Sequence, residues 1–521
     1  MLKWLKSLAF KQQCRDTRIA KKKVVTTNAG LDSVSRKSAR QFEHPLDQHQ
    51  SGQHQSKKHA KYLSHATIVP RGEHGISRKR IDKHALKVLY RLHQAGFQAC
   101  LVGGAVRDLL IGEIPKDFDV ATDATPEQVA ALFRNCRLIG RRFRLAHVYF
   151  GRQTIEVATY RADHGRSDSG CLDETGRIVR DNVYGNISDD VWRRDFTANA
   201  LYYDISNFSV IDFVGGLSHV KQRHLQMIGD ADKRYHEDPV RMLRAIRFAA
   251  KLDFTIEENS RLPIYELAPL LQDIPAARLY EEVLKMFHSG HALKSFNALN
   301  EFNILHYLFP ATALAIKEDP QIMPLLQSAM TSTDERIKNN QHVTPAFLFA
   351  ALLWGPVSKR AQEISAKGLP YSVAIQKAAT AVMRQQVKSI SIPRRFTSTM
   401  RDIWGLQTRF HYRKGRRVMA VLEHPKFRAA YDFLCLRARS GEEVEADCEW
   451  WTNLQQLSVE QQNKILKQPG RSKKTGSKKA GSNKIDGKKT SVSKQNTAVD
   501  KSAQAGKPRK PRSKHKPSTQ L

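Results

Sequence analysis

Two aspartates separated by one residue, Asp117 and Asp119, carry the clearest chemical signal in the sequence. Their segment, KDFDVAT, alternates polar and apolar residues, which predicts a strand with both carboxylates on one face and with Phe118 and Val120 toward the core. Adjacent carboxylates repel each other unless a cation lies between them, and Mg²⁺ prefers carboxylate, water and phosphate oxygens. The pair therefore favours a metal-dependent phosphoryl- or nucleotidyl-transfer site, with a solvated acidic pair as the alternative.

Two glycines upstream, Gly103 and Gly104, strengthen the functional interpretation. Glycine allows a ligand to approach the backbone closely, and successive N–H groups can cradle a phosphate. Arg107, one helical turn later, is placed to reach the same triphosphate. A tight turn followed by a surface arginine is the alternative, but the aspartates that follow favour phosphate binding.

The segment WRRDFTANA contains Arg194 and Asp195. An Arg-Arg-Asp run ahead of apolar residues is typical of a capped helix start. It also suits a site in which Arg194 contacts a phosphate and Asp195 lies beside the metal or the ribose. The residues alone leave both interpretations open.

A third segment, EDPVRMLRAIR, predicts a helix with Asp238 as its N-cap and Pro239 in the first position. At about 100° per residue, four cations of this helix share roughly a third of its circumference. They are Arg241, Arg244, Arg247 and Lys251. The segment offers almost no acids to pair with them, so the stripe favours a polyanionic ligand over a solvated face.

An α/β domain with a small mixed sheet is predicted to position these motifs. Periodicity predicts a helix over His84–Gln94, a short strand before Gly103, and strands over CRLIG, HVYF and TIEVATY, the last two joined by a turn at residues 151–153. Thr125, Pro126 and Gln128 form the signature of a helix start. From Glu237 to about residue 467, helix follows helix.

Positive charge is concentrated at the two ends of this chain of 521 residues, whose formal net charge is +35. Residues 469–521 hold 16 lysines and arginines against 2 acids, and residues 1–66 hold 14 against 4. Such a surplus points to nucleic acid or to an anionic membrane surface. We expect a disordered basic extension (1–66), an α/β head (67–216), a helical neck (217–310), a helical body (311–467) and a disordered Lys-rich tail (468–521).

Cysteine usage and hydropathy indicate the compartment. The six cysteines are widely spaced and form no CxxC pair, which excludes a disulfide scaffold and indicates a reducing environment. The longest apolar run, Ala346–Trp354, is too short to span a bilayer. One face of a short helix could be formed by Leu2, Trp4, Leu5 and Leu8, and such a helix could contact a membrane or target an organelle. A flexible N-terminal segment without a fixed structure is the favoured interpretation. We expect a cytoplasmic monomer without stable membrane insertion, with peripheral membrane contact left open.

Together and in this order, GGAVRD, KDFDVAT, RRDFTANAL and EDPVRMLRAIRF resemble the motifs of the bacterial poly(A) polymerase and CCA-adding group of class II nucleotidyltransferases. The resemblance covers about residues 67–440 and implies a nucleotidyltransferase head followed by an all-α neck and body. It implies that Asp117 and Asp119 hold two Mg²⁺ ions, or Mn²⁺, with ATP as substrate. Glu156 matches a third carboxylate of some relatives, with a salt bridge in a strand as the alternative.

The resemblance also implies roles for the other motifs. Arg194 contacts the nucleotide, together with the Gly103–Gly104 turn, and Asp195 is essential for catalysis. Asp238 and Arg241 read the base of the incoming nucleotide by hydrogen bonding. Arg244 lies nearby for the phosphates, and the neck as a whole binds nucleotide and RNA.

Segments 138–148, 394–407 and 423–438 resemble the poly(A) polymerase branch of the group. In the body, basic residues are interleaved with Phe396, Phe410 and Tyr412, and such a mixture holds single-stranded RNA by phosphate contact and base stacking. The predicted RNA-binding residues are Arg394, Arg395, Arg413, Lys414, Arg416 and Arg417. The alternative is a solvated helix face.

The resulting hypothesis is template-independent addition of AMP to RNA 3′ ends, with release of pyrophosphate, in mRNA processing and RNA decay. Proteins of RNA decay are expected partners. A CCA-adding tRNA nucleotidyltransferase is the nearest alternative. An RNA-binding protein with a decayed site is disfavoured because every expected acid and arginine is present, and a small-molecule nucleotidyltransferase is disfavoured by the charge.

Overall fold

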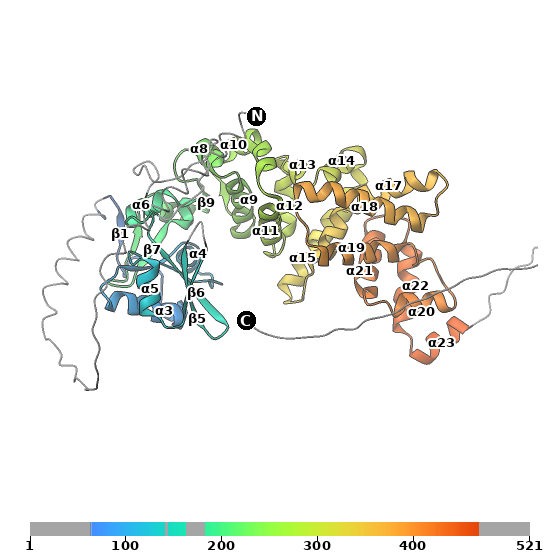
Figure 1. Cartoon of the computed structure of the whole chain (residues 1–521), viewed down its shortest axis with the longest axis horizontal. Coiled ribbons are helices and arrows are strands. Elements are labelled where there is room, and N and C mark those ends of the chain that lie inside the picture. Colours follow the sequence, from blue (N-terminus) through green and yellow to red (C-terminus); the bar gives the residue numbers. More distant parts are fainter. Residues whose placement is uncertain (1–62, 64, 141–143, 163–182, 468–521) are drawn as a thin grey trace, which may run out of the picture. The chain divides into compact units, whose positions relative to one another are not determined.

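A computed structural model describes residue 63 and residues 65–140, 144–162 and 183–467 (Figure 1). The described residues up to Leu466 fall within one unit of the chain. The N-terminal helix expected around Leu2, the basic extension and the Lys-rich tail lie outside the described residues. So does part of segment 138–148.

An eight-stranded mixed sheet forms the head, in the order β1-β8-β7-β2-β3-β6-β5-β4. Neighbouring strands are antiparallel except β3 and β6, which are parallel. The strands are β1 (Thr67–Val69), β2 (Ala99–Val102), β3 (Asp119–Thr122), β4 (Cys136–Ile139), β5 (Leu145–Phe150), β6 (Gln153–Thr159), β7 (Leu201–Asp204) and β8 (Val210–Asp212). The prediction of a mixed sheet in an α/β head is therefore confirmed.

Helices of the head pack against this sheet as their apolar spacing predicts. Helix α3 (Lys83–Gln94) contacts β2 and β3, and α5 (Pro126–Leu132) contacts β4 and β5. The cap of α5 is the predicted capping box, in which Thr125 and Gln128 bind each other's backbone N–H groups. Helices α4 (Gly104–Leu110), α6 (Ile187–Trp192) and α7 (Gly216–Gln222) and the 3₁₀ turn η3 (Thr197–Asn199) complete the motif-bearing part of the head.

Three local features of the structure differ from the sequence interpretation. The strand of KDFDVAT begins only at Asp119, because β2 ends at Val102, its partner, and the chain turns at Gly103. Asp117 therefore lies in the loop that precedes the strand. The segment after Asp195 forms a 3₁₀ turn and β7 rather than a helix. The third expectation concerned Asp238, which ends α8 instead of opening the next helix, although its carboxylate accepts a bond from the Val240 N–H.

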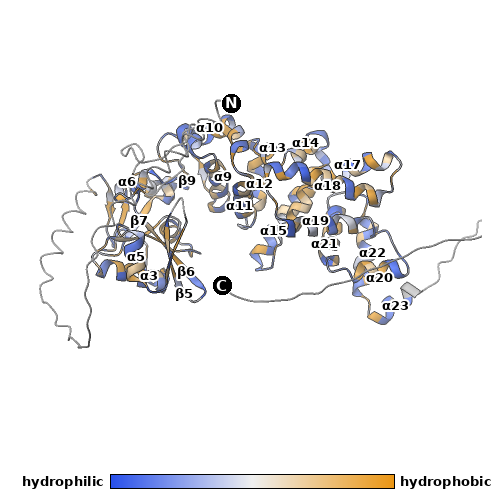
Figure 2. Cartoon of the chain, in the orientation of Figure 1, coloured by the Kyte–Doolittle hydropathy of each residue, from blue (hydrophilic) through white to orange (hydrophobic). Residues whose placement is uncertain are grey.

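From the head to Lys467, where the described residues end, the chain is helical apart from one short parallel pair, β9 (His224–Leu225) with β10 (Thr255–Ile256). The helices are α8 (Ala231–Glu237), α9 (Val240–Leu252), α10 (Glu258–Leu267), α11 (Ala276–Phe287), α12 (Ala292–Glu301), α13 (Leu305–Leu308), α14 (Pro310–Glu318), α15 (Met323–Lys338), α16 (Pro345–Leu352), α17 (Trp354–Ala366), α18 (Tyr371–Ser389), α19 (Arg394–Gln407), α20 (Arg416–Leu422), α21 (Phe427–Arg439), α22 (Glu445–Gln456) and α23 (Val459–Lys467). Single helices mix hydrophobic and hydrophilic residues (Figure 2), as amphipathic packing requires.

Three hydrophobic clusters hold these elements together. The largest joins one face of the sheet to the neck and body helices as far as α21. A smaller cluster covers the other face of the sheet and includes Val102 and Tyr202. The third, around Phe410 and Trp451, belongs to α19–α22. No helix in the described ranges is both long and apolar enough to cross a membrane.

One feature of the body differs from the expectation for cysteine. Cys435 of α21 and Cys448 of α22 form a disulfide with a Cα–Cα distance of 5.3 Å. The sequence separation of 13 residues gave no such signal, because only the helix–turn–helix geometry brings the two sulfur atoms together. Cys100 and Cys136 are free.

Candidate active site

The carboxylates of the site lie on neighbouring strands of the sheet. Asp119 pairs with Val102 of β2, and the parallel register of β3 with β6 places it beside Glu156. Phe118 and Val120 are buried on the opposite face, as predicted. Partial desolvation and the nearby carboxylates of Glu156 and Asp117 raise the pKa of Asp119 to about 6, against the opposing effect of Arg194. The sheet therefore gathers negative charge at this point.

An open cavity of about 600 Å³ lies beside these carboxylates, and Asp117, Glu156, Lys116 and Arg152 line it. Glu156 has one basic neighbour, His147, at 3.6 Å on β5. Within the described residues no three acidic, His or Cys side chains converge closely enough to hold a metal by themselves. Mg²⁺ is typically bound by one or two carboxylates completed by water and substrate phosphates, so Asp117 and Asp119 fit the ion only together with a nucleotide.

Gly103 forms the turn between β2 and α4. Its φ of +74° lies in the region that favours glycine, and a Cβ there would lie 3.6 Å from Nη1 of Arg194. The Gly103 N–H donates to the carbonyl of Leu201. Of the two glycines, Gly104 is thus the one whose N–H remains at the free first turn of α4.

The protein hydrogen-bonds Nε and Nη2 of Arg194, whereas Nη1 faces the Gly103 turn. Its Nε donates to the Tyr202 hydroxyl at 2.8 Å and to Asp190 at 3.1 Å, and its Nη2 donates to Asp190 at 2.9 Å. Tyr202 itself donates to Asp190. These contacts leave Nη1 toward Gly103 and bring the positive charge close enough to lower the pKa of Asp119. The structure thus brings the predicted Arg194, Gly103 and Asp119 together.

Arg107 has a different environment from the predicted one. Its side chain is 2% exposed, its Nε donates to Asp108 at 2.9 Å, and its Nη1 donates to Asn199. The ring of Phe248 lies 5.6 Å from its guanidinium carbon. In this conformation Arg107 ties α4 to η3 and α9 rather than facing a triphosphate, so its nucleotide contact stays a prediction.

Asp195 links the head to the neck. Its Oδ2 accepts from Nε of Arg244 at 2.8 Å, and its Oδ1 accepts from the Phe196 N–H at 2.8 Å and from Asn199 at 3.3 Å. Burial opposes the charge, but Arg244 and these hydrogen bonds hold the pKa of Asp195 at about 2. Both carboxylate oxygens are therefore engaged by the protein itself.

The two predicted base-reading residues also have ionic partners. Asp238 accepts from Nη2 of Arg278 at 2.6 Å, and Arg241 donates through Nη1 to Glu237 at 2.8 Å and to the carbonyl of Arg234 at 2.7 Å. Arg241 is only 8% exposed. Each side chain is thus positioned by its own partners near the start of α9.

The expectation that the α9 stripe lacks acidic partners was wrong. Arg241, Arg244 and Arg247 face Glu237, Asp195 and Glu282, the last pair at 3.8 Å. Asp195 comes from the head and Glu282 from α11, so the segment alone could not reveal them, whereas Glu237 is the first residue of the segment EDPVRMLRAIR itself. Among the described residues, the fourth cation, Lys251, has no such ion pair.

Sequence reasoning also missed the residues that orient Arg194 and the neck. These are Asp190, Tyr202, Asn199, Arg234, Glu237 and Arg278. Arg234 donates to both Glu237 and the carbonyl of Arg194. Most of them lie within ten residues of a motif, and this proximity was the only feature of the sequence that could have identified them.

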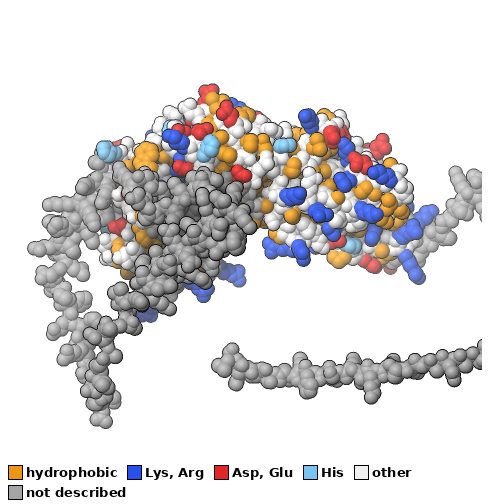
Figure 3. All heavy atoms as spheres, turned by 45° about the horizontal axis from the view of Figure 1, so that its top comes forward, with side chains coloured by type: hydrophobic (Ala, Val, Ile, Leu, Met, Phe, Trp, Pro, Cys, Tyr) orange, Lys and Arg blue, Asp and Glu red, His pale blue; other side chains and the backbone are white. Residues whose placement is uncertain are grey.

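The predicted RNA-binding residues of the body separate into two groups. Arg394 and Arg395 open α19, whereas Arg416 and Arg417 open the next helix, α20. Arg413 is bound by Asp447 and by the Phe410 carbonyl, and Phe410 is fully buried, so neither matches the predicted open stacking surface. On the visible face of the body, Lys and Arg side chains are dispersed with acids between them (Figure 3).

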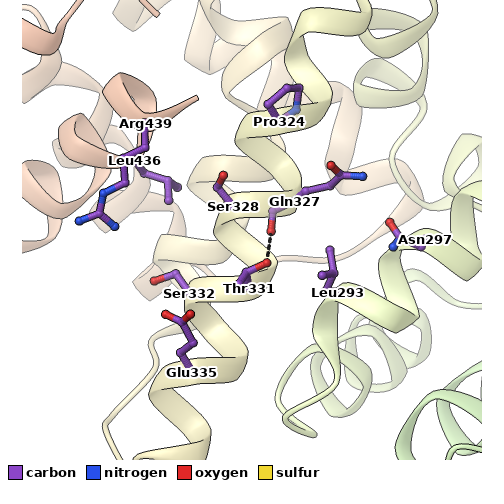
Figure 4. Close-up of a pocket in the computed structure, with 10 residues that line it drawn as sticks. All are labelled: Leu293, Asn297, Pro324, Gln327, Ser328, Thr331, Ser332, Glu335, Leu436 and Arg439. Atoms are coloured by element: carbon purple, nitrogen blue, oxygen red, sulfur yellow. Dashed lines mark hydrogen bonds between the residues drawn. The ribbon is translucent and has the colours of Figure 1, made fainter. Parts of the chain in front are cut away.

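Another cavity, of about 500 Å³, lies between α12, α15 and α21 (Figure 4). Neutral side chains such as Ser328, Thr331 and Gln327 line most of it, and Thr331 donates to the carbonyl of Gln327. None of the predicted site residues reaches this cavity, so it does not belong to the carboxylate site.

Three family models match the chain. They are described as the poly A polymerase head domain (residues 99–226), the probable RNA and SrmB-binding site of polymerase A (253–316) and the polymerase A arginine-rich C-terminus (367–485). The matches cover the sheet, the neck and the body in that order.

Curated relatives and solved structures agree with these models. Poly(A) polymerase I of Salmonella typhimurium is 47% identical over 413 residues, which cover 78% of this chain and 89% of the relative, and that of Haemophilus influenzae is 43% identical over 413 residues, covering 78% and 91%. A CCA-adding enzyme of Lactobacillus helveticus is 35% identical over 247 residues, covering 47% and 60%. A solved CCA-adding enzyme with CTP shares the fold, with a TM-score of 0.51, 20% identity and coverage of 74% and 86%.

Proposed function

The chain belongs to the bacterial poly(A) polymerase I family, and we propose from this membership that it adds AMP from ATP to RNA 3′ ends without a template, releasing pyrophosphate. The observation that carries the proposal is the extent of the match. Sequence similarity to poly(A) polymerase I runs through the arginine-rich body, whereas sequence similarity to the CCA-adding enzyme of Lactobacillus helveticus covers 47% of the chain. The chain is a polynucleotide adenylyltransferase.

Asp117 and Asp119 are the residues that would hold Mg²⁺, since their crowded carboxylates fit a divalent cation once nucleotide phosphates complete its coordination. Bound there, the metal supplies charge neutralisation and an activated 3′-hydroxyl. The protein's own contribution is to fix Asp119 at the start of β3, opposite the last residue of β2 and close to Arg194.

Arg194 would stabilise the charge that develops on the triphosphate. Its other donors are bound by Asp190 and Tyr202, so the guanidinium needs little reorganisation when the phosphates arrive. Asp195 acts in this proposal as a positioning residue, because it holds Arg244 and the start of α9 against the head.

Asp238 and Arg241 would read the base through hydrogen bonds, supported by Arg278 and Glu237. A site built on hydrogen bonds rejects a base that leaves its polar groups unpaired. ATP would therefore be preferred over CTP because of pairing geometry.

The experiment that tests the function compares nucleotides on a generic RNA. ATP alone is expected to give long Mg²⁺-dependent extension, and CTP alone is expected to give little. With both nucleotides present, addition should continue beyond three nucleotides. Addition that stops after a short CTP- and ATP-dependent sequence would instead identify a CCA-adding activity.

We further propose that the chain acts in the cytoplasm in mRNA processing and RNA decay, together with proteins of RNA decay and as a monomer. Support comes from the family and from the basic composition. Size-exclusion chromatography with light scattering would measure the oligomeric state.

A further inference from the structure

A third cavity, of about 390 Å³, lies at the other end of α4 from Gly103. Its walls come from the loop between α4 and β3, from Arg223 at the end of α7, from Lys251 near the end of α9, and from His291 before α12. Because α4 has seven residues, about 10 Å of helix separates this cavity from the Gly103 turn. The cavity is thus distinct from the proposed triphosphate position.

Three cations line this cavity: Lys116, Arg223 and Lys251. In the described part of the chain none of the three forms an ion pair. Two carboxylates, Asp108 and Glu113, line the cavity with them. Asp108 accepts from Arg107 at 2.9 Å, which leaves Glu113 alone against the three cations. The cavity therefore carries an excess of positive charge.

This arrangement disfavours the charged form of Lys251. Burial lowers its pKa, Asp108 opposes the shift, and the charges of Arg107, Lys116 and Arg247 add to it. The three arginines of the same helix have acidic partners, and Lys251 does not. An anion in the cavity would offset the repulsion among these cations.

The cavity is continuous in its lining with the carboxylate site. Lys116 contributes to both cavities and directly precedes Asp117. Ile114, in the same loop, is 83% exposed and offers an apolar surface beside the cations. Cations with an adjacent apolar side chain match a sugar–phosphate chain better than a free phosphate, which has no apolar part.

We propose that this cavity binds the phosphodiester backbone of the RNA just upstream of its 3′ end, through Lys116, Arg223 and Lys251. The cavity then guides the last nucleotides past Lys116 to the carboxylates, while the body arginines hold RNA further upstream. This inference rests on the proposed function for the identity of its ligand.

The test uses the double variant Arg223→Gln with Lys251→Gln in the full chain, and spares Lys116 because it adjoins Asp117. Binding of a short fluorescent oligo(A) is measured without ATP over a series of salt concentrations. The variant is expected to bind about tenfold more weakly at low salt. Its salt dependence should be shallower by about 1.4 in the log–log slope, because each lost single-strand contact removes about 0.7.

The matched control is Arg360→Gln with Lys367→Gln, which removes the same charge from α17 and from the residue that caps its C-terminus; this helix packs on α14, α16 and α18. The control should retain the affinity and salt slope of the original chain for the short oligo(A). Equal losses in both variants, or unchanged binding in the cavity variant with an unchanged melting temperature, would overturn the proposal.

Kinetic measurements separate RNA from free polyphosphate as the ligand. The cavity variant is expected to raise KM for the RNA and to leave KM for ATP and product inhibition by pyrophosphate unchanged. A change confined to ATP or pyrophosphate would show that the cavity binds polyphosphate and would refute the RNA assignment. If the original chain adds no AMP at all, the proposed function fails, yet the binding series still reports on the cavity.

Discussion

Arginines are abundant both at the head–neck junction and in the body, but their surroundings differ. At the junction Arg241, Arg244 and Arg278 bind Glu237, Asp195 and Asp238. In the body Arg416 and Arg417 are exposed and, as far as the described residues extend, have no acidic partner. A paired, buried guanidinium fixes geometry, whereas an unpaired, exposed one remains available to a polyanion. The partner therefore decides the role of an arginine.

The largest expected effect separates chemistry from binding. Asp119→Asn should lower AMP addition by about a thousandfold or more, because several kcal/mol of charge stabilisation depend on the carboxylate pair. Affinity for RNA without ATP should stay within about twofold, since the body and the cavity cations are untouched. Primer extension and anisotropy measure the two quantities. A folded variant with substantial Mg²⁺-dependent addition would remove Asp119 from the site.

Breaking the junction should cost stability as well as activity. Asp195→Asn leaves Arg244 without its ionic partner in a mostly buried position, so the free energy of unfolding should fall by about 3 kcal/mol. Chemical denaturation measures this. The matched body variant, Asp447→Asn, removes a carboxylate that is 25% exposed, against 11% for Asp195, and should cost about 1 kcal/mol or less. Equal costs would contradict the distinction between the two regions.

The pH dependence of the same variant gives a second check. The pKa of Asp195 is held at about 2, below the ordinary value of 3.8, so the native state keeps it ionised. Its stabilisation is complete above pH 3.8 and is lost as the pH falls toward 2. The difference in stability between the original chain and Asp195→Asn should therefore be constant near neutrality and shrink over that acidic range.

A smaller effect is expected on base choice. Arg241→Ala removes a positioned donor, and the preference for ATP over CTP in kcat/KM should fall by about tenfold, equivalent to about 1.4 kcal/mol. Competition between the two nucleotides on one primer measures it. Lower turnover with an unchanged preference would assign Arg241 to structure or to the phosphates.

The smallest effect should come from the body. Arg416→Gln with Arg417→Gln should leave the free energy of unfolding within about 0.5 kcal/mol, because these side chains are exposed. The salt slope for a long RNA should become shallower by about 1.4, with little change for a short primer. An effect of equal size on the short primer would place these arginines near the 3′ end instead.

The sequence was sufficient for features that depend on local periodicity. It predicted α3, the capping box of α5 and the inward side chains around Asp119, since each follows from the spacing of neighbouring residues. It failed where the deciding partner is distant in the chain. The buried state of Arg107 depends on Asn199, and the pairing of Arg244 depends on Asp195, 92 and 49 residues away respectively.

The fixed contacts around the base-reading pair have a consequence for the product. Arg234 donates to the carbonyl of Arg194 and to Glu237, and Glu237 accepts from Arg241. Hydrogen bonds therefore connect the proposed base-reading residue Arg241 to the segment of Arg194, which is proposed to contact the phosphates. A reader that does not rearrange between cycles applies one criterion to every incoming nucleotide. Selection of the same base in every cycle produces a homopolymer, and the length of that homopolymer then depends on how long the RNA stays bound.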